Sequence, residues 1–411
     1  MQNRIIGFFI VIVFVLLGVG ALSAEDGINL EQSLSAFYSN NYDILISKYE
    51  IDKAQADYIA ARLIPNPNLS FNYSFIGLKG FPSTTDNTQT TLRVDQLIEL
   101  GGKRGLRSDF ASVTIEAVKL TQKDTVRLLL IGFYTLFFNI NADILNAELA
   151  KEELKRFDRT LEIADRRFRA GFLSYVDYAK LKIARIDLEN NLSTLQAQMN
   201  NDIEQFSFLL GSSTPLKPSL SVREDFSGNT EDDLLQRAYQ YRFDLLSIEK
   251  QINASEFNKQ LAQSQAVPDI TVGLEFETVE GWNNPSIGFG ISIPLPIFNR
   301  NQGEIARRQA ELYQLQAERD KVKRQIVSDI RQALNNYSSS IHIFESYKSR
   351  KSDLDDLKAR SEKAFSLGGI TILDLLDTEK TYRDFMTKYN QALVQGNLNR
   401  ELLKVYTGEI L

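Results

Sequence analysis

Two aspartates three residues apart are the side chains whose types and spacing best suit the attraction or repulsion of ions. They lie in the run Thr371-Ile372-Leu373-Asp374-Leu375-Leu376-Asp377. Residues three apart share one face of an α-helix, so the two carboxylates would project together. Paired carboxylates of this kind attract cations and repel anions. The alternative is that Asp374 only caps or solvates the start of a helix, as Asp177 would do elsewhere in the chain.

The composition argues against most other site chemistry. The chain has no cysteine, which excludes disulfides, thiolate metal sites, cysteine nucleophiles and the cysteine-linked anchor of bacterial lipoproteins. One histidine, His342, and three methionines are too few for a metal cluster within one chain. No serine-nucleophile elbow, phosphate loop or zinc pattern occurs, so we expect no enzyme and no cofactor. The net charge of -6 leaves no basic excess for nucleic acid.

The aspartate run belongs to a segment that the chain contains twice. The stretches 168–211 and 365–408 both begin at a phenylalanine, continue as a predicted helix and end at a glycine. Gly171 and Gly368, and likewise Asp177 and Asp374, are 197 residues apart. A register kept over about 44 residues without an insertion indicates an internal duplication.

The first residues of the chain differ from the rest. Arg4 precedes an uncharged apolar run over residues 5–22, and small residues follow before Glu25. This pattern predicts a secretory signal peptide over residues 1–24. A retained transmembrane anchor is the alternative, because the run is just long enough to span a bilayer.

A very long helix is predicted after the first strands. From Leu106 to Arg169 there is no proline and only one glycine, Gly132. A helix of more than 60 residues would be close to ~100 Å long. Such a rod indicates a coiled-coil or tubular architecture instead of a compact domain.

Both halves of the chain are predicted to follow one order of elements. The first repeat, 25–218, contains a helix over about 30–63, a β-hairpin over 68–100 and coiled-coil helices over 106–170 and 174–211. The second repeat, 219–411, contains a helix over about 231–266, a β-hairpin over 269–297 and coiled-coil helices over 302–366 and 371–408.

The four predicted strands have one apolar face and one polar or small face. Phe71, Tyr73 and Phe276, for example, alternate with serine, asparagine or glutamate. Strands of a transmembrane barrel need this alternation, but four strands cannot close a barrel alone. Three copies would supply twelve strands. We therefore expect a mainly α-helical chain with a small transmembrane β part that is shared between copies.

At this point the chain resembles the TolC family of outer-membrane export channels, and more narrowly its heavy-metal branch of CzcC-like and CusC-like proteins. The resemblance covers about residues 28–410. It rests on the duplicated order of elements and on three short segments: Leu97-Ile98-Glu99-Leu100-Gly101-Gly102-Lys103-Arg104-Gly105, Arg167-Phe168-Arg169-Ala170-Gly171 and Ala364-Phe365-Ser366-Leu367-Gly368.

The resemblance implies a homotrimer with a twelve-stranded barrel in the outer membrane, continued by an α-helical tunnel through the periplasm. Asp374 and Asp377 would then form rings that gate the closed end of the tunnel. The turns at that end would meet a periplasmic adaptor protein linked to an inner-membrane pump of the RND type. The residues assigned to these tip turns and to adaptor docking are Gly171, Phe172, Leu173, Gly368, Gly369 and Ile370. The alternative is that the apolar side chains among them only pack the turns.

Basic residues accompany both ends of the long helix. The resemblance places the strand-to-helix junction, Gly101, Gly102, Lys103 and Arg104, at the membrane edge. Lys103, Arg104 and Arg107 would contact outer-membrane lipid headgroups there, or nothing in particular. At the other end, Arg166, Arg167 and Arg169 could pair with carboxylates and hold the tip closed.

These expectations combine in a passive trimeric exit duct, the outer-membrane component of a tripartite efflux system for heavy-metal cations or drugs. Three alternatives remain at this level: a periplasmic coiled-coil adaptor, an outer-membrane channel of type I protein secretion, and a diffusion porin. An adaptor would need a lipoyl-like β module, and a porin would need many more strands per chain and no helical rods.

Overall fold

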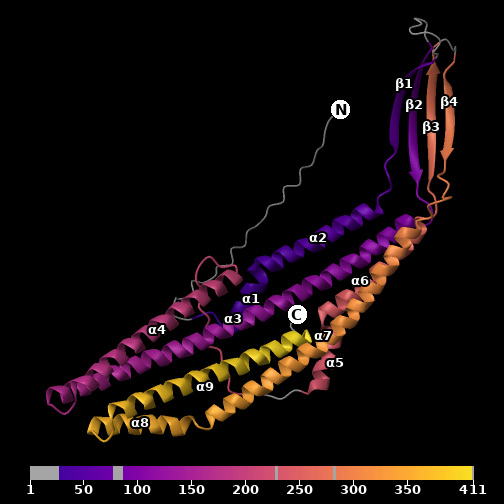
Figure 1. The fold of residues 1–411 in the computed structure, drawn as a ribbon. Helices are drawn as coiled ribbons and strands as arrows, with labels where there is room; N and C mark the ends of the chain where they lie inside the picture. The colour runs from indigo at the N-terminus through magenta and orange to yellow at the C-terminus, as the bar shows by residue number, and fades with distance from the viewer. Residues whose placement is uncertain (1–26, 77–86, 227–229, 281–283, 410–411) are drawn as a thin grey trace, which may run out of the picture.

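The protein is an elongated helical body with a narrow β-sheet at one end (Figure 1). The computed structural model describes residues 27–76, 87–226, 230–280 and 284–409. The predicted signal peptide lies outside these residues, as do most of the two predicted strand-connecting loops, over 77–88 and 281–285.

The predicted long helix is present. Helix α3 spans Lys103–Arg169, 67 residues, and begins slightly earlier than expected. After a tight turn, α4 (Tyr175–Leu209) runs back along it. Part of α3 is apolar enough in length and composition to cross a membrane, a test that a buried core helix also passes. The side chains of Leu130, Phe133 and Phe137 are buried in the helical core.

The second long helix is not continuous, so the prediction of one rod over 302–366 was wrong. Helix α7 (Gln302–Lys348) ends, and α8 (Lys351–Leu367) begins after a break at Ser349 and Arg350. The Ser346 and Ser349 hydroxyls donate to backbone carbonyls three or four residues earlier. Serine side chains that compete in this way weaken a helix locally and favour a bend. Helix α9 (Ile372–Thr407) then returns along α8 and α7.

The first helix of each repeat is also broken in two. Instead of one helix over 30–63, the structure has α1 (Leu30–Asn40) and α2 (Tyr42–Arg62). Instead of one helix over 231–266, it has α5 (Glu231–Tyr241) and α6 (Phe243–Ser264). The backbone is extended at Asn41 and at Arg242. The Asn41 side chain caps α2 by accepting from the Ile44 N–H and also donates to the Leu209 carbonyl, 2.8 Å.

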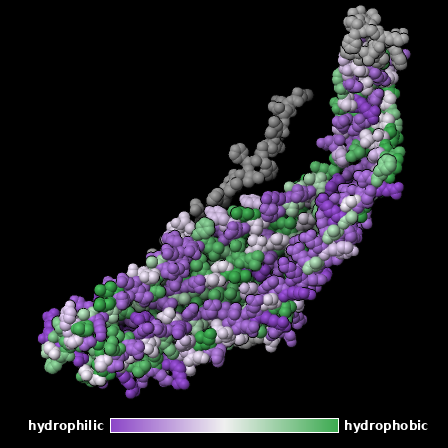
Figure 2. Space-filling model, viewed as in Figure 1, coloured by the Kyte–Doolittle hydropathy of each residue, from purple (hydrophilic) through white to green (hydrophobic). Residues whose placement is uncertain are grey.

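The sheet has four antiparallel strands in the order β1-β2-β3-β4. Their bounds are Asn68–Ile76, Asn87–Ile98, Ile270–Val279 and Ser286–Ser292. Phe71, Leu92, Phe276 and Ile287 lie opposite one another across the strands, while the adjacent row, on the other face, contains Ser70, Arg93, Glu275 and Gly288. The apolar side chains are exposed, and Figure 2 shows hydrophobic residues along the sheet. Within the described chain, β1 and β4 are edges with no strand beside them.

The helices form a wall with two edges. Near the strands, α3 packs against α2 and α6, and α6 packs against α7. Toward the opposite end, α3 packs against α4 and α9, and α9 packs against α7 and α8. One edge is therefore formed by α2 and α4, and the other by α7 and α8 (Figure 1). The short helices α1 and α5 lie midway, where α1 contributes Phe37 to a core with Phe133 and Phe206.

Candidate functional site

The first tip turn joins α3 to α4. Gly171 has φ of 78°, a left-handed conformation that glycine adopts without strain. The N–H of Phe172 donates to the Arg167 carbonyl, 2.8 Å, and closes the end of α3. Ser174 then begins α4 by accepting from the Asp177 N–H, 3.1 Å. The Phe172 side chain is left 77% exposed at the end of the molecule.

The second tip turn joins α8 to α9 in the same way. Gly368 has φ of 79°, and the Gly369 N–H donates to the Ala364 carbonyl, 2.8 Å. Leu367 and Leu373 on either side of the turn are exposed, and Ile370 is half-buried.

The two carboxylates beyond this turn have different surroundings. The Asp374 carboxylate accepts from the Thr371 hydroxyl, 2.7 Å, and from the Thr371 N–H, 3.0 Å. These bonds form a capping box and hold the pKa of Asp374 below its usual range, so its carboxylate is ionised at neutral pH. Asp377 lies one turn further along, and both residues are exposed. Asp374 therefore does take the capping role that the sequence left open, and its carboxylate remains negatively charged in that role.

One residue connects the two tips. The Arg167 guanidinium donates to the Phe365 carbonyl, 2.7 Å, and lies 5.3 Å from the centre of the Phe365 ring. The expected partner of Arg167 was a carboxylate, and a backbone carbonyl takes that place. Arg169 pairs with Asp165 of its own helix at 2.9 Å. A small apolar core behind these contacts joins the two hairpins through Phe157, Leu181, Phe365 and Leu375.

The strand-to-helix junction is held by buried charge. Gly101 and Gly102 both have left-handed backbones, with φ of 69° and 72°. The Lys103 ammonium, on a residue only 7% exposed, bonds the Asp269 carboxylate and the Val267 carbonyl, each at 2.6 Å. Arg107 bonds Glu99, 2.7 Å, and the Ala61 carbonyl, 2.9 Å. The interpretation of Lys103 and Arg107 as lipid contacts is thus corrected, because both are engaged within the chain; Arg104 is exposed.

Replacing Lys103 with methionine should destabilise the folded protein by about 1.5–3 kcal/mol, because the half-buried Asp269 carboxylate loses a charged hydrogen-bond partner. Thermal unfolding of the detergent-solubilised protein measures the loss. The matched control is Arg104→Met, at an exposed residue of the same junction, where we expect a change of no more than about 0.5 kcal/mol. Equal effects of the two substitutions would contradict a structural role for Lys103.

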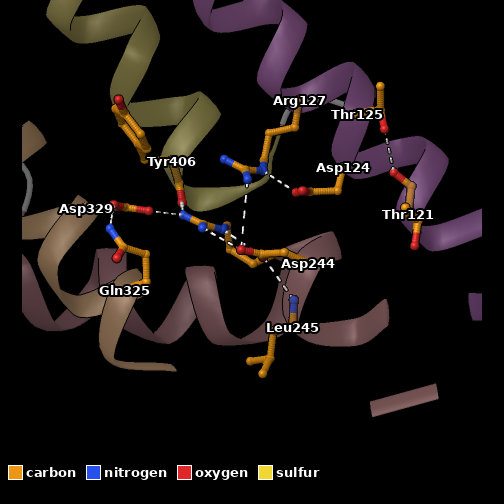
Figure 3. A network of polar contacts seen from close by, with 10 residues as sticks. Thr121, Asp124, Thr125, Arg127, Asp244, Leu245, Gln325, Asp329 and Tyr406 are labelled. Carbon is orange, nitrogen blue, oxygen red and sulfur yellow. Dashed lines mark hydrogen bonds and ion pairs between the residues drawn. The ribbon is translucent and has the colours of Figure 1, made fainter. Parts of the chain in front are cut away.

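A buried charge network lies midway along the body, where α3, α6, α7 and α9 meet (Figure 3). The Arg242 guanidinium bonds Asp244 at 2.6 Å, Asp329 at 3.1 Å and the Tyr406 carbonyl at 3.3 Å. Arg127 of α3 bonds Asp124 at 2.6 Å and lies 3.9 Å from Asp244. The sequence did not predict this network. A signal existed, because Arg242 follows Asn41 by 201 residues, Tyr406 follows Leu209 by 197 residues, and Asn41 and Leu209 make the equivalent bond in the first repeat.

A groove runs between α4 and α9 with α3 as its floor, near the tip half of the body. Its cavities are lined by residues of both kinds of charge, among them Glu153, Asp187, Lys380 and Arg383. Glu153 of α3 accepts from Arg383 of α9 at 3.0 Å. Burial raises the pKa of Glu153, and the Arg383 charge opposes that rise. The groove therefore presents paired charges along the seam between the two hairpins.

Metal-binding side chains are not gathered in one copy of the chain. Among the described residues, no group of three or more histidine, cysteine, aspartate or glutamate side chains could hold a metal ion. His342 is exposed on α7.

Comparison with known proteins agrees with this arrangement. The model of the family described as "Outer membrane efflux protein" matches residues 34–212 and 234–409. The cobalt-zinc-cadmium resistance protein CzcC of Cupriavidus metallidurans is 25% identical over 90% of this chain and 88% of its own length. The outer membrane protein TolC of Escherichia coli is 24% identical over 94% of this chain and 85% of its own length.

Solved structures share the fold at lower identity. A crystal structure of CusC, reported in connection with folding and transmembrane channel formation, superimposes with a TM-score of 0.77 at 18% identity, over 92% of this chain and 91% of that one. The outer membrane protein VceC of Vibrio cholerae superimposes with a TM-score of 0.74 at 15% identity, over 92% of this chain and 95% of that one. At these identities the likeness establishes the TolC-like fold of a helical body with a small β part.

Proposed function

This chain belongs to the outer membrane efflux protein family, and we propose that it is the passive exit duct of a tripartite efflux system. Three copies form the duct, with the sheets in the outer membrane and the helices in the periplasm. The duct performs no chemical reaction, because a pump in the inner membrane supplies the free energy and the duct supplies a path and a gate.

The observation that carries the proposal is that the β-sheet and the helical wall of one chain each have two open edges. The sheet ends at β1 and β4, each with an unpaired side, and its apolar face is exposed on the side opposite Arg93 and Glu275. An isolated sheet edge cannot lie in lipid, so these edges need strands of another copy. The helical wall has matching edges at α2 and α4 and at α7 and α8. Three copies joined edge to edge give a closed barrel of twelve strands above a closed helical tube.

The tip turns support docking of a periplasmic adaptor. Phe172, Leu367 and Leu373 are each more than 60% exposed at the end furthest from the sheet. Apolar side chains exposed together mark contact surfaces, and here they lie where the duct must meet the rest of the system. We assign Gly171, Leu173, Gly368, Gly369 and Ile370 to the same surface, as the residues that shape the turns, and an RND-type pump as the energy source behind the adaptor.

Heavy-metal cations are the substrate class that we favour, with drugs as the other class. The relative CzcC carries cobalt, zinc and cadmium resistance in its name. The gate assigned to Asp374 and Asp377 suits cations, since three copies would bring six exposed carboxylates to one constriction.

The double substitution Asp374→Asn with Asp377→Asn should neutralise this constriction. In planar bilayers we expect small, cation-selective conductance from the native trimer, and a several-fold rise in conductance or loss of cation selectivity from the variant. The matched control is Asp177→Asn, which changes the equivalent carboxylate at the start of α4 and should leave selectivity unchanged. A monomeric mass would contradict the trimeric duct, and a trimer with unaltered conductance in the double variant would contradict the carboxylate gate.

A further inference from the structure

Asp143 of α3 and Asp202 of α4 place two interacting carboxyl groups between the packed helices of the first hairpin. Both residues are half-buried, and their neighbours Ile144 and Ile203 belong to the central core. The Asp143 Oδ2 atom is fully buried, and no donor group of the described chain bonds it. Two ionised carboxylates have no hydrogen to share, so one added proton is what this contact requires.

The second repeat shows which residues occupy the equivalent positions there. The residues 197 positions after Asp143 and Asp202 are Ser340 and Asn399. The Asn399 amide donates to the Ser340 hydroxyl at 3.3 Å and to the Asn336 carbonyl at 3.1 Å. The second repeat therefore joins α7 and α9 here through a neutral hydrogen bond at any pH. The first repeat has an ionisable pair at the same place, which makes its bond conditional on a proton.

Among the described residues, no lysine or arginine forms an ion pair with either carboxyl group. From α4, the neutral Gln198 amide donates to Asp202 at 2.9 Å. From α9, Asn390 donates to the neutral Asn146 of α3 at 3.2 Å, and Lys388 lines the same groove as Asn146. From α1, the core receives apolar side chains such as Phe37. Among the described residues, Asp202 is the charged group that acts on the Asp143 carboxyl.

A second carboxyl pair in the molecule illustrates the difference. Glu362 of α8 and Glu379 of α9 also face each other, but the Lys358 ammonium lies 3.4 Å from Glu379 and shares the site. There a cation offsets part of the repulsion when both carboxylates ionise. Among the described residues no cation pairs with Asp143 or Asp202, so their repulsion acts directly on the packing of α3 against α4.

We propose that Asp143 and Asp202 form a proton-binding site that joins α3 to α4 when it holds one proton and pushes the two helices apart when it holds none. The site lies between the two helices of the first hairpin, and its proton binding follows from the fold whether or not the chain conducts ions. The further statement, that the periplasmic wall of the duct tightens in acid, rests on the function proposed above.

The direction of the pH effect follows from the pKa. Burial and the contact with Asp202 raise the pKa of Asp143 from 3.8 to about 6. The folded state therefore holds the proton more tightly than the unfolded chain, and the resulting stability is complete in acid and is lost as the pH rises through about 6. Solvent screening weakens the repulsion of a half-buried pair, so about a 100-fold change in the opening equilibrium of the hairpin is the upper limit and a several-fold change is the expected effect.

The experiment compares the native protein with the double variant Asp143→Ser plus Asp202→Asn, which installs the neutral pair of the second repeat. Hydrogen exchange of the α3 and α4 amides around both positions is measured from pH 4 to pH 8 and corrected for intrinsic exchange rates. We expect protection of the native hairpin to fall by up to about 100-fold across this range. Protection of the same segment in the variant should lack that step, while the α7 and α9 segment around Ser340 should behave alike in both proteins.

Infrared difference spectroscopy supplies a direct second readout. A protonated carboxyl band that titrates near pH 6 should be present in the native protein and missing from the double variant and from Asp202→Asn alone. In the single variant Asp202→Asn, the new amide can donate a hydrogen bond to Asp143. This variant keeps the proposal testable if the double variant does not fold. Identical titrations in native and variant proteins, or a native hairpin that exchanges no faster at pH 8 than at pH 4, would overturn the proposal. Because neither readout uses ion flow, its failure is separable from failure of the duct.

Discussion

Replacing Arg242 with methionine is expected to destabilise the folded protein by about 3–5 kcal/mol at neutral pH, the cost of breaking a buried ion pair from one side. The Arg242 side chain is 2% exposed, and its loss would leave Asp244 and Asp329 without their main partner. It would also remove the donor to the Tyr406 carbonyl, the contact that ties the start of α6 to the end of α9. Urea unfolding of the detergent-solubilised protein measures the change.

Acid should reduce this difference, and the direction can be worked out from Asp244. Burial alone would raise the pKa of Asp244, but the hydrogen bonds and charge of Arg242, helped by Arg127, bring it below its ordinary value. A lowered carboxyl pKa gives stability that is present above the pKa of the unfolded chain and is lost as the pH falls through that of the folded state. The gap between native and variant should therefore be constant from pH 7 to about 5 and shrink below about 4.

Two controls separate an unpaired charge from lost packing. Arg331→Met removes an exposed ion pair with Glu231 and should cost at most about 1 kcal/mol. Adding Asp244→Asn to Arg242→Met removes a stranded carboxylate and should recover part of the loss. If the double variant is no more stable than Arg242→Met, the network acts through packing and the electrostatic account is wrong.

The sequence was sufficient to predict elements whose signal is local and repeated. The rod of α3 follows from more than 60 residues without proline, and the strands follow from alternation such as that around Phe71. The tip turns follow from Gly171 and Gly368 within one register. The equal offset of these glycines and the open edges of a four-stranded sheet together predict a channel built from several copies.

The features that the sequence did not predict depend on contacts between distant segments. Neither glycine nor proline marks Asn41 or Arg242 as a break, and the only local signal is the capping preference of asparagine at Asn41. Each break is stabilised by a bond to a carbonyl at the end of another helix. The break at Ser349 and Arg350 has only a weak serine signal. The pairing of Asp143 with Asp202 requires knowing how α3 faces α4, and periodicity alone does not fix that rotation.

Gly211→Ala is expected to destabilise the protein far more than Gly171→Ala, although both glycines have left-handed backbones, with φ of 66° and 78°. A methyl group at Gly171 meets nothing within 4 Å, so the cost there is the strain of the conformation, about 1–2 kcal/mol. A methyl group at Gly211 would collide with the Asn40 carbonyl at the end of α1, a backbone atom that cannot move aside as a flexible side chain can. Overpacking adds about 1–3 kcal/mol, for a total of about 2–5 kcal/mol.

The duplicated register makes this contrast testable twice. Gly408 stands where Gly211 does, and a methyl group there would lie 2.6 Å from the Tyr241 carbonyl at the end of α5. Gly368 stands where Gly171 does, and its nearest neighbour is the movable Arg167 side chain at 3.2 Å. Unfolding midpoints should therefore fall steeply for the two mid-body substitutions and slightly for the two tip substitutions. Equal losses at all four positions would mean that the left-handed backbone alone sets the cost. The pattern that we expect would instead show that the mid-body glycines are required by the close approach of α1 and α5, whereas the tip glycines are required only by the turns.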